Sequence, residues 1–337
     1  AAARNRQRAG SPESRRRALG LLCLSQVGVW AATFLSVFLG PFAIKEMTGS
    51  FALGGLPFAM YYLSNLLVVF PAGRLMDRVG RAPVLALGHA TGAGGAAAVA
   101  LSLGAHAGGN PLVLASFLGG LFLLSAGSSI AFLTRVPAAD LYPLEERARG
   151  IGRIILMSFA GSLLGAGAFA ALARDGPFAV ASGYILMLPF FFLGFASMVL
   201  LSRSSFRMAS VMRGPRGSLR SVLARPGVRW TVASNAGAQG GMGGVMSFAS
   251  AALMPLGGLV SGAVMLGHFG GMFLPSPVAG RLADRVSRST CILMGGLVLG
   301  LGAALFVRTD IDWLAGVGLI CVGAGWCLTY IPGSAIL

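Results

Sequence analysis

The residues of this chain best suited to chemistry lie in two short charged turns, because nearly everything around them is uncharged. GRLMDRVGR at residues 73–81 places Asp77 among three arginines, and GRLADRVSR at residues 280–288 repeats the arrangement 207 positions later. A carboxylate in such a turn can pair with guanidinium groups, or it can accept hydrogen bonds from the N-terminus of a neighbouring helix. The pattern predicts an ionic latch that can form and break.

The residues assigned to this latch are turn glycines and the charged side chains beside them. They are Gly73, Asp77, Arg78, Gly80 and Arg81 in the first copy, and Gly280, Asp284, Arg285 and Arg288 in the second. The alternative is a loop whose arginines only orient the protein in a membrane. That alternative does not explain an Asp at the same offset in both copies.

The rest of the sequence predicts that membrane-spanning helices position these turns. The chain is 55% hydrophobic and 11% charged, whereas soluble domains carry about 25% charged residues. Runs free of Asp, Glu, Lys and Arg predict ten spans, two each in 82–134 and 230–280 and one each in 18–44, 47–73, 154–173, 176–202, 289–307 and 313–337. The expected fold class is therefore an all-α integral membrane protein. Glycine-rich GAGGAAA (92–98) and GSLLGAG (161–167) are expected to be helix contact faces.

The positive charges predict the orientation of these spans. Of the 26 Lys and Arg residues, 23 fall on one side, which we assign to the cytoplasm together with the N-terminus. The expected parts are a basic cytoplasmic arm (1–17), a six-helix bundle (18–202), a basic cytoplasmic loop (203–229) and helices 7 to 10 (230–337). The expected location is the plasma membrane, which is the inner membrane of a bacterium.

Composition also excludes several other classes of function. A net charge of +16 would suggest nucleic acid for a soluble protein, but this chain has little soluble fold on which to carry a basic face. Its cysteines, Cys23, Cys291, Cys321 and Cys327, lie in apolar runs without metal-ligand spacing. We therefore expect no nucleic-acid partner, no disulfide, no metal and no cofactor. An enzyme would need convergent acids, histidines or a metal cluster, and the sequence offers none.

Both charged turns resemble the signature loop of the major facilitator superfamily, G-x-L-x-D-R-x-G-R. The matching residues are Gly73, Leu75, Asp77, Arg78, Gly80 and Arg81, then Gly280, Leu282, Asp284, Arg285 and Arg288, with Ser287 in place of the usual glycine. DLYPLEERARG (140–150) resembles the loop that follows helix 4 in the family. HFGGMFLPSPVAGRLADR (268–285) resembles an uncharacterised bacterial branch of permeases.

The resemblance implies two pseudo-symmetric six-helix bundles that alternately expose a central site, with helices 11 and 12 expected beyond Leu337. It implies that Asp77 and Arg81 join Asp140 in a network that gates the cytoplasmic side. It also implies a monomeric secondary transporter that exports a small drug-like or metabolite solute, with protons as a candidate coupling ion. Ala166 stands where the antiporter motif has proline, and Gly120 stands where helix 4 usually has arginine. The alternative is a non-transporting membrane receptor that keeps the fold.

The candidates for the substrate cavity are uncharged polar and aromatic residues, because no Asp or Glu lies inside a predicted span. Gln26 and Thr33 share one helical face, as do Asn235 and Gln239, and helices 1 and 7 line the cavity in the family. The full set is Gln26, Thr33, Asn65, Asn235, Gln239, Trp326 and Tyr330. The alternatives are interhelical hydrogen bonds for the polar residues and interface anchors for the aromatic ones.

Two histidines are the remaining titratable groups within the spans. His89 and His268 are candidates for proton coupling, because imidazole changes its charge near neutral pH. The alternative is that each serves packing or a hydrogen bond inside the helical bundle.

Overall fold

The protein, examined as a computed structural model, is helical, and its described part contains no strand. The described residues are 12–105, 110–142, 147–172, 179–204, 221, 224–253, 256–307 and 312–336. They fall into two compact units, unit 1 within Ala1–Met212 and unit 2 within Arg213–Leu337. The predicted all-α class is confirmed, and the division between the units lies inside the basic stretch 203–229.

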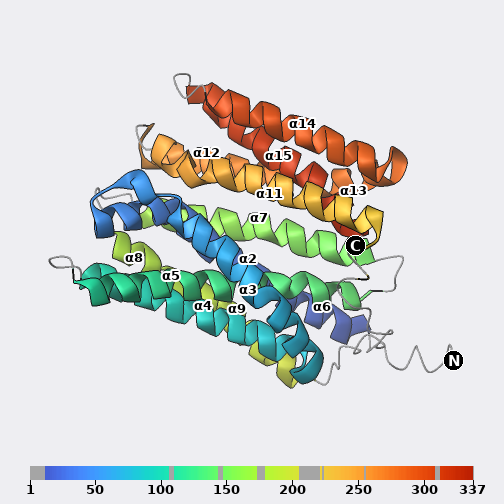
Figure 1. Ribbon diagram of the computed structural model, residues 1–337. Coiled ribbons are helices and arrows are strands. Elements are labelled where there is room, and N and C mark those ends of the chain that lie inside the picture. The colour runs from blue at the N-terminus through green and yellow to red at the C-terminus, as the bar shows by residue number, and fades with distance from the viewer. Residues whose placement is uncertain are drawn as a thin grey trace. The chain divides into compact units, whose positions relative to one another are not determined.

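Unit 1 contains the first six predicted spans (Figure 1). Its elements are α2 (Pro12–Thr48), η1 (Phe51–Leu53), α3 (Leu56–Val79), α4 (Arg81–Gly104), α5 (Pro111–Ala131), η2 (Phe132–Thr134), α6 (Arg135–Asp140), α7 (Arg147–Leu172), α8 (Val180–Ile185) and α9 (Met187–Arg203), where η marks a 3₁₀ turn. α2 packs against α7 and α9, and α4 packs against α5 and α9. At the start of α5, Asn110 Oδ1 accepts a hydrogen bond from Leu112 N at 2.9 Å, which satisfies a backbone donor that has no partner inside the helix.

Unit 2 contains the remaining helices. They are α11 (Pro226–Leu253), α12 (Gly258–Phe273), α13 (Ser276–Arg285), α14 (Arg288–Phe306) and α15 (Asp312–Ile336). α15 packs against α11, α12 and α14, so it is the central helix of this unit.

Eight helical segments within the described ranges are long and apolar enough to cross a membrane. All six predicted spans of unit 1 are among them, as are α14 and α15 of unit 2. The two spans predicted within 230–280 correspond to α11 and α12, which do not meet these criteria of length and mean hydropathy. α12 has 16 residues, fewer than the about 20 needed to cross the hydrocarbon core. α11 has 28 residues, but its glycines, asparagine and glutamine lower its mean hydropathy.

The first charged turn is a link of one residue between two helices. α3 ends at Val79 and α4 begins at Arg81, while Gly80 between them has φ of 99° and ψ of 162°. Residues with a Cβ atom rarely adopt this conformation. The backbone at Gly80 therefore favours glycine, and the dependence of the turn on this residue stays a prediction.

The second charged turn uses a different backbone conformation. Ser287 occupies the position equivalent to Gly80, and its φ of 177° and ψ of 154° are ordinary extended values. Its hydroxyl oxygen accepts a hydrogen bond from Thr290 N at 3.0 Å and so caps α14. The serine in place of the usual glycine thus accompanies a real change in how the chain turns.

Both glycine-rich stretches predicted to be contact faces do lie at helix contacts. In residues 92–98, Gly95 faces α5. In residues 161–167, Gly161 faces α2, where an added Cβ would lie 2.5 Å from the carbonyl oxygen of Val27. The helices approach so closely at these positions that only glycine fits. Small residues commonly allow such close packing between membrane-spanning helices.

A seam of glycines joins α4 and α5 in unit 1. Gly88 and Gly95 on α4 are seven residues apart, as are Gly120 and Gly127 on α5. An added Cβ at Gly95 would lie 2.8 Å from the carbonyl oxygen of Gly120, and one at Gly127 would lie 2.5 Å from that of Gly88. The two backbones are therefore in direct contact across two helical turns.

Unit 2 repeats this glycine seam between α14 and α15. An added Cβ at Gly302 would lie 2.6 Å from the carbonyl oxygen of Gly318, and one at Gly325 would lie 2.6 Å from that of Gly295. Gly295 and Gly302 stand 207 positions after their counterparts on α4, the same offset as the charged turns. The internal repeat therefore extends from the charged turn through the following helix.

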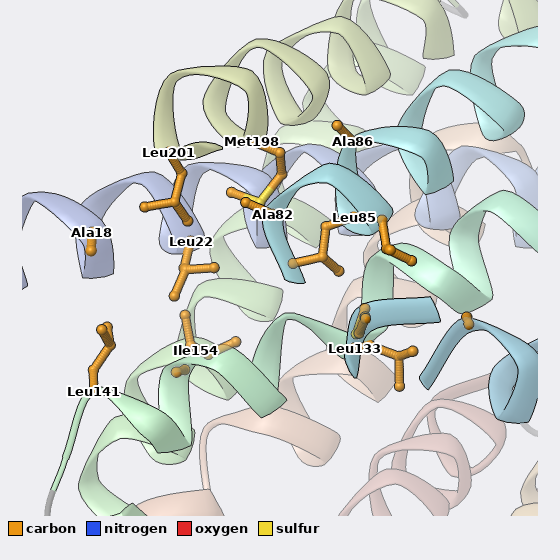
Figure 2. Packing of buried hydrophobic residues seen from close by; sticks show 14 residues of the cluster. Ala18, Leu22, Ala82, Leu85, Ala86, Leu133, Leu141, Ile154, Met198 and Leu201 are labelled. Carbon is orange, nitrogen blue, oxygen red and sulfur yellow. The ribbon is translucent and has the colours of Figure 1, made fainter. Parts of the chain in front are cut away.

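An apolar cluster, shown in Figure 2, includes residues on both sides of the charged turn of unit 1. Its buried members are Ala18, Leu22, Ala72, Met76, Ala82, Val84, Leu85, Ala86, Leu133, Ala138, Leu141, Ile154, Met198 and Leu201. Met76 and Ala82, on either side of the turn, are 5% and 3% exposed. Packing of apolar side chains from several helices thus fixes the position of the turn.

Candidate functional site

Arg81 and Asp140 form an ion pair beside the first charged turn. Arg81 is the first residue of α4 and Asp140 the last of α6, and their side chains are 14% and 7% exposed. The pair therefore ties the α3–α4 turn to the end of the fourth span. Since both groups are largely shielded from water, the loss of one partner would leave the other charge poorly compensated.

Two other charged residues of this turn are exposed rather than buried in an ion pair. Asp77 and Arg78 occupy the last turn of α3 and are exposed in unit 1. Asp77 forms no ion pair with any residue in the described ranges. Of the three residues expected to form one network, the structure brings together Arg81 and Asp140 but not Asp77.

For the second charged turn, the structure describes the backbone of the predicted latch residues but not their side chains. Gly280, Asp284 and Arg285 lie on α13, and Arg288 begins α14. Their side chains are outside the described part of the chain, so their role as latch residues stays a prediction.

Gln26 is the centre of a buried polar network in unit 1. Its side chain is on α2, is 5% exposed, and donates from Nε2 to Ser158 Oγ on α7 at 2.9 Å. Its Oε1 accepts a hydrogen bond from the hydroxyl of Thr134 in η2. These contacts are those of the interhelical hydrogen-bonding alternative, because both polar ends of the amide are used within the unit.

The other two polar candidates of unit 1 bond to their own helices. Thr33 Oγ1 donates to Val29 O at 2.7 Å, and Asn65 Nδ2 donates to Tyr61 O at 3.1 Å. Both side chains are half-buried. Such local bonds leave Thr33 and Asn65 available as candidates without adding support for a substrate role.

Both histidines are buried inside their units. His89 Nε2 lies 2.7 Å from Ser25 Oγ, and His268 Nδ1 lies 2.7 Å from Leu319 O. The two imidazoles are 0% and 1% exposed. In this state each links neighbouring helices, as the packing alternative expects, and neither is reached by bulk water.

Three of the predicted cavity residues meet in unit 2. Trp326 Nε1 on α15 donates to Gln239 Oε1 on α11 at 2.6 Å. The Trp326 and Tyr330 rings are stacked, with centroids 4.5 Å apart and planes at 12°. Phe273 of α12 approaches the indole edge-on, with a centroid distance of 6.5 Å. We call Gln239, Trp326 and Tyr330 the amide–aromatic cluster.

Asn235 lies one helical turn before Gln239 on α11 and completes this side of unit 2. Its Oδ1 is buried and accepts no hydrogen bond from the described residues. Its amide packs against Gly333 on α15, where an added Cβ would lie 2.7 Å from both amide atoms. Asn235 therefore presents a buried acceptor next to the amide–aromatic cluster.

The sequence analysis missed an aromatic group in unit 1. Trp30 and Phe132 have ring centroids 4.9 Å apart, and Tyr61 lies 6.4 Å from Phe132. The residues come from α2, α3 and η2, so no spacing rule connects them. One available signal was that Trp30 follows Gln26 by four positions and therefore shares its helical face.

Comparison with known proteins gives one consistent assignment. The sequence profile of the Major Facilitator Superfamily matches residues 22–337. Two similar proteins of Bacillus subtilis (strain 168) are the uncharacterized MFS-type transporters YdeG and YddS. YdeG is 26% identical, with 97% of this chain and 80% of that protein covered. YddS is 23% identical, with 97% and 79% covered.

Solved structures share the fold. The partially occluded inward-open form of the xylose transporter XylE from E. coli matches with a TM-score of 0.71 at 15% identity, covering 96% of this chain and 84% of that one. The transporter FucP in its outward conformation matches with a TM-score of 0.61 at 16% identity, covering 96% and 90%. The profile match, the repeated charged turn and the two helical units agree. The chain belongs to the major facilitator superfamily and is a multi-pass membrane transporter, not an enzyme.

Proposed function

We propose that this secondary transporter exports a small, uncharged organic solute by alternating access, and that the solute contacts the amide–aromatic cluster of unit 2. That cluster is the observation on which the proposal rests. It combines a stacked pair of rings with an amide held by the indole N–H, and none of its side chains is charged. Such a surface suits a drug-like molecule or metabolite with a flat apolar face and a few polar groups.

The buried Oδ1 of Asn235 favours a solute that carries a hydrogen-bond donor. A buried acceptor without a donor costs about 1–3 kcal/mol. A hydroxyl or N–H group of a bound solute would satisfy its Oδ1, which receives no hydrogen bond within the described residues. Asn235 and Gln239 share one face of α11, so a single solute could contact both amides.

The positions of the acidic residues support an uncharged solute. Among the described helices, acids occur only at or near helix ends: Glu13, Glu46, Asp77, Asp140, Asp284 and Asp312. A cation within the membrane is ordinarily met by a carboxylate, and the middle of the described spans provides none. XylE and FucP are named for xylose and fucose transport, and sugars are uncharged solutes.

We assign the two charged turns to a cytoplasmic gate, one turn in each proposed half of the transporter, the N-terminal bundle (18–202) and the C-terminal bundle (230–337). The pairing of Arg81 with Asp140 supports this assignment, because a partly shielded ion pair stabilises one arrangement of the helices it joins. Asp77 and Arg78 are exposed and therefore accessible to a partner that the gate brings near. Gly280, Asp284, Arg285 and Arg288 would serve the same gate from the second half.

We place the transporter in the bacterial plasma membrane as a monomer with its N-terminus in the cytoplasm. The unequal distribution of the 26 Lys and Arg residues supports this orientation. Protons are the proposed coupling ion, since one structural neighbour, with a TM-score of 0.63, is a D-xylose-proton symporter. His89 and His268 are buried, so either would have to become exposed during the cycle to exchange a proton.

A thermal-shift screen of the full-length protein in detergent tests the solute class. The panel contains sugars, neutral drugs, lipophilic cations and organic anions, and a compound that binds the native state raises the melting temperature. We expect hits among the uncharged compounds. Trp326→Phe, which removes the indole N–H, should weaken them, whereas Trp313→Phe on the same helix should not, because Trp313 is 69% exposed.

Flux assays in proteoliposomes then test transport and its direction. An uncharged hit should cross the membrane when loaded on the cytoplasmic side, and Trp326→Phe should slow it. Hits confined to cations would show that the proposed solute class is wrong. A compound that binds and is never transported in either direction would favour the non-transporting receptor.

A further inference from the structure

A second concentration of positive charge lies at Tyr142, two residues after Asp140 in the chain. Arg153 on α7 donates from Nη1 to Tyr142 Oη at 2.9 Å. The guanidinium of Arg15, in the first turn of α2, lies over the Tyr142 ring with Cζ 5.5 Å from the centroid. Two cations from helices far apart in sequence therefore meet at one side chain.

Neither cation is neutralised by a carboxylate that the structure describes. The ion pair in this region joins Asp140 to Arg81, so the acid nearest to Tyr142 in the described sequence is already used. Arg15 and Arg153 are exposed and form no ion pair within the described ranges. Two like charges at one side chain repel each other, and an anion bound between them would remove that repulsion.

Buried apolar residues underlie these groups. Leu141, which precedes Tyr142, belongs to the buried cluster together with Ala18 and Ile154 (Figure 2). Tyr142 itself packs against that cluster. Apolar contacts thus hold the ends of α2, α6 and α7 together, and these are the helix ends next to Arg15, Tyr142 and Arg153.

The position of Arg15 along α2 places it near the surface of the membrane. α2 spans Pro12–Thr48, and its uncharged run begins at Ala18, one turn after Arg15. At 1.5 Å per residue, a helix of 37 residues is about 55 Å long, longer than the roughly 30 Å hydrocarbon core. Arg15 is therefore expected at the level of the lipid headgroups.

We propose that Arg15, Tyr142 and Arg153 bind a phosphate group, presented by an anionic phospholipid or as free phosphate. Guanidinium groups match the geometry of phosphate oxygens and keep their charge at any physiological pH. The Tyr142 hydroxyl accepts from Arg153, and its own proton can be donated to a phosphate oxygen. The headgroup depth of the site makes phospholipid the expected source.

Native mass spectrometry of the full-length transporter tests the site directly. The purified protein is titrated with phosphatidylglycerol in a background of phosphatidylcholine. We expect selective retention of phosphatidylglycerol, with binding weakened about fivefold in Arg153→Gln. Tyr142→Phe keeps the ring and removes the hydroxyl, and it should also weaken binding. Arg203→Gln is the matched control, because Arg203 is an exposed arginine in the last turn of α9.

Inorganic phosphate at constant ionic strength separates the two sources. If millimolar phosphate displaces the lipid and raises the melting temperature, the site binds free phosphate. If it does neither while phosphatidylglycerol stays bound, the source is the lipid. Equal losses of phosphatidylglycerol in Arg153→Gln and Arg203→Gln would overturn the proposal, because diffuse positive charge would then explain the binding.

Discussion

One substitution is expected to have opposite effects at the two glycines of the first charged turn. Gly80 has φ of 99°, and an added Cβ there would find its nearest neighbour, Pro83 Cδ, at an ordinary distance of 3.7 Å. Gly73 lies inside α3, where an added Cβ meets no atom within 4 Å. Crowding is absent at both sites, so any difference between Gly80→Ala and Gly73→Ala must arise in the backbone.

The expected magnitudes follow from that difference. A side chain in the backbone conformation of Gly80 costs about 1–3 kcal/mol, and the lower freedom of alanine in the unfolded chain offsets about 0.4–1 kcal/mol. Gly80→Ala should therefore lower the free energy of unfolding by up to about 2.6 kcal/mol. Gly73→Ala should raise it by up to about 1 kcal/mol, because alanine favours the helix more than glycine does.

Thermal unfolding of the full-length variants in one detergent provides the measurement. A change of 1 kcal/mol corresponds to roughly 2–4 °C for a domain of 150–250 residues. Several scan rates should be compared, because membrane proteins often unfold irreversibly. Equal melting temperatures for Gly80→Ala and Gly73→Ala would refute the reasoning, since the turn would then tolerate a Cβ without strain.

Three further predictions concern the helix contacts and the ion pair. Gly95→Leu should abolish the folded peak in size-exclusion chromatography because of the backbone contact with α5, while Gly94→Leu should keep it, since a Cβ at Gly94 meets no atom within 4 Å. Gln26→Leu should lower the stability by about 1–3 kcal/mol in a thermal melt, because it removes the hydrogen bonds of Gln26 to the buried Ser158 and Thr134 hydroxyls. Thr33→Val removes only a bond within its own helix and should change the stability by less than about 0.5 kcal/mol. Asp140→Asn should lower the stability by about 1–3 kcal/mol, the cost of leaving a buried polar group without its partner. Exchanging the two charges of the pair should restore part of that loss, and an exchange variant no better than Asp140→Asn would argue against a direct pairing.

The spans and the turns could be predicted because charge is so costly in lipid. Residues such as Arg81 and Lys45 must lie near the ends of helices, so the uncharged runs mark most of the spans in advance. The two segments within 230–280 are less clear, because a helix rich in glycine and amides has a weak hydrophobic signal. The tight turn at Gly80 was predictable for a similar reason, since few residue types suit it.

The partners of the polar side chains could not be predicted. Gln26 and Gln239 are the same residue type in equivalent first helices of the two halves, yet Gln26 bonds to α7 and η2 while Gln239 bonds to an indole. The rotation of each helix about its axis decides this, and that rotation depends on contacts with helices far along the chain. The family resemblance implied that Arg81 meets both Asp140 and Asp77, but it could not tell which of the two acids pairs with Arg81, because that depends on where α6 ends.

The glycine seams impose a stricter rule on sequence change than the charged turns do. At the charged turn, the two halves use two different residues and backbone conformations. Gly80 has a positive φ, whereas Ser287 has an extended backbone and caps the next helix. In the seam, Gly88 and Gly95 of α4 recur as Gly295 and Gly302 of α14 at the same offset of 207 positions. An added Cβ at any of the four would lie closer than 3.0 Å to an atom of the facing helix, which leaves no room for a side chain. We expect the sequences of the two halves to diverge at the turns and at the substrate contacts, while the seam glycines are retained. New substrate specificities would then arise without a change in the packing of these helices.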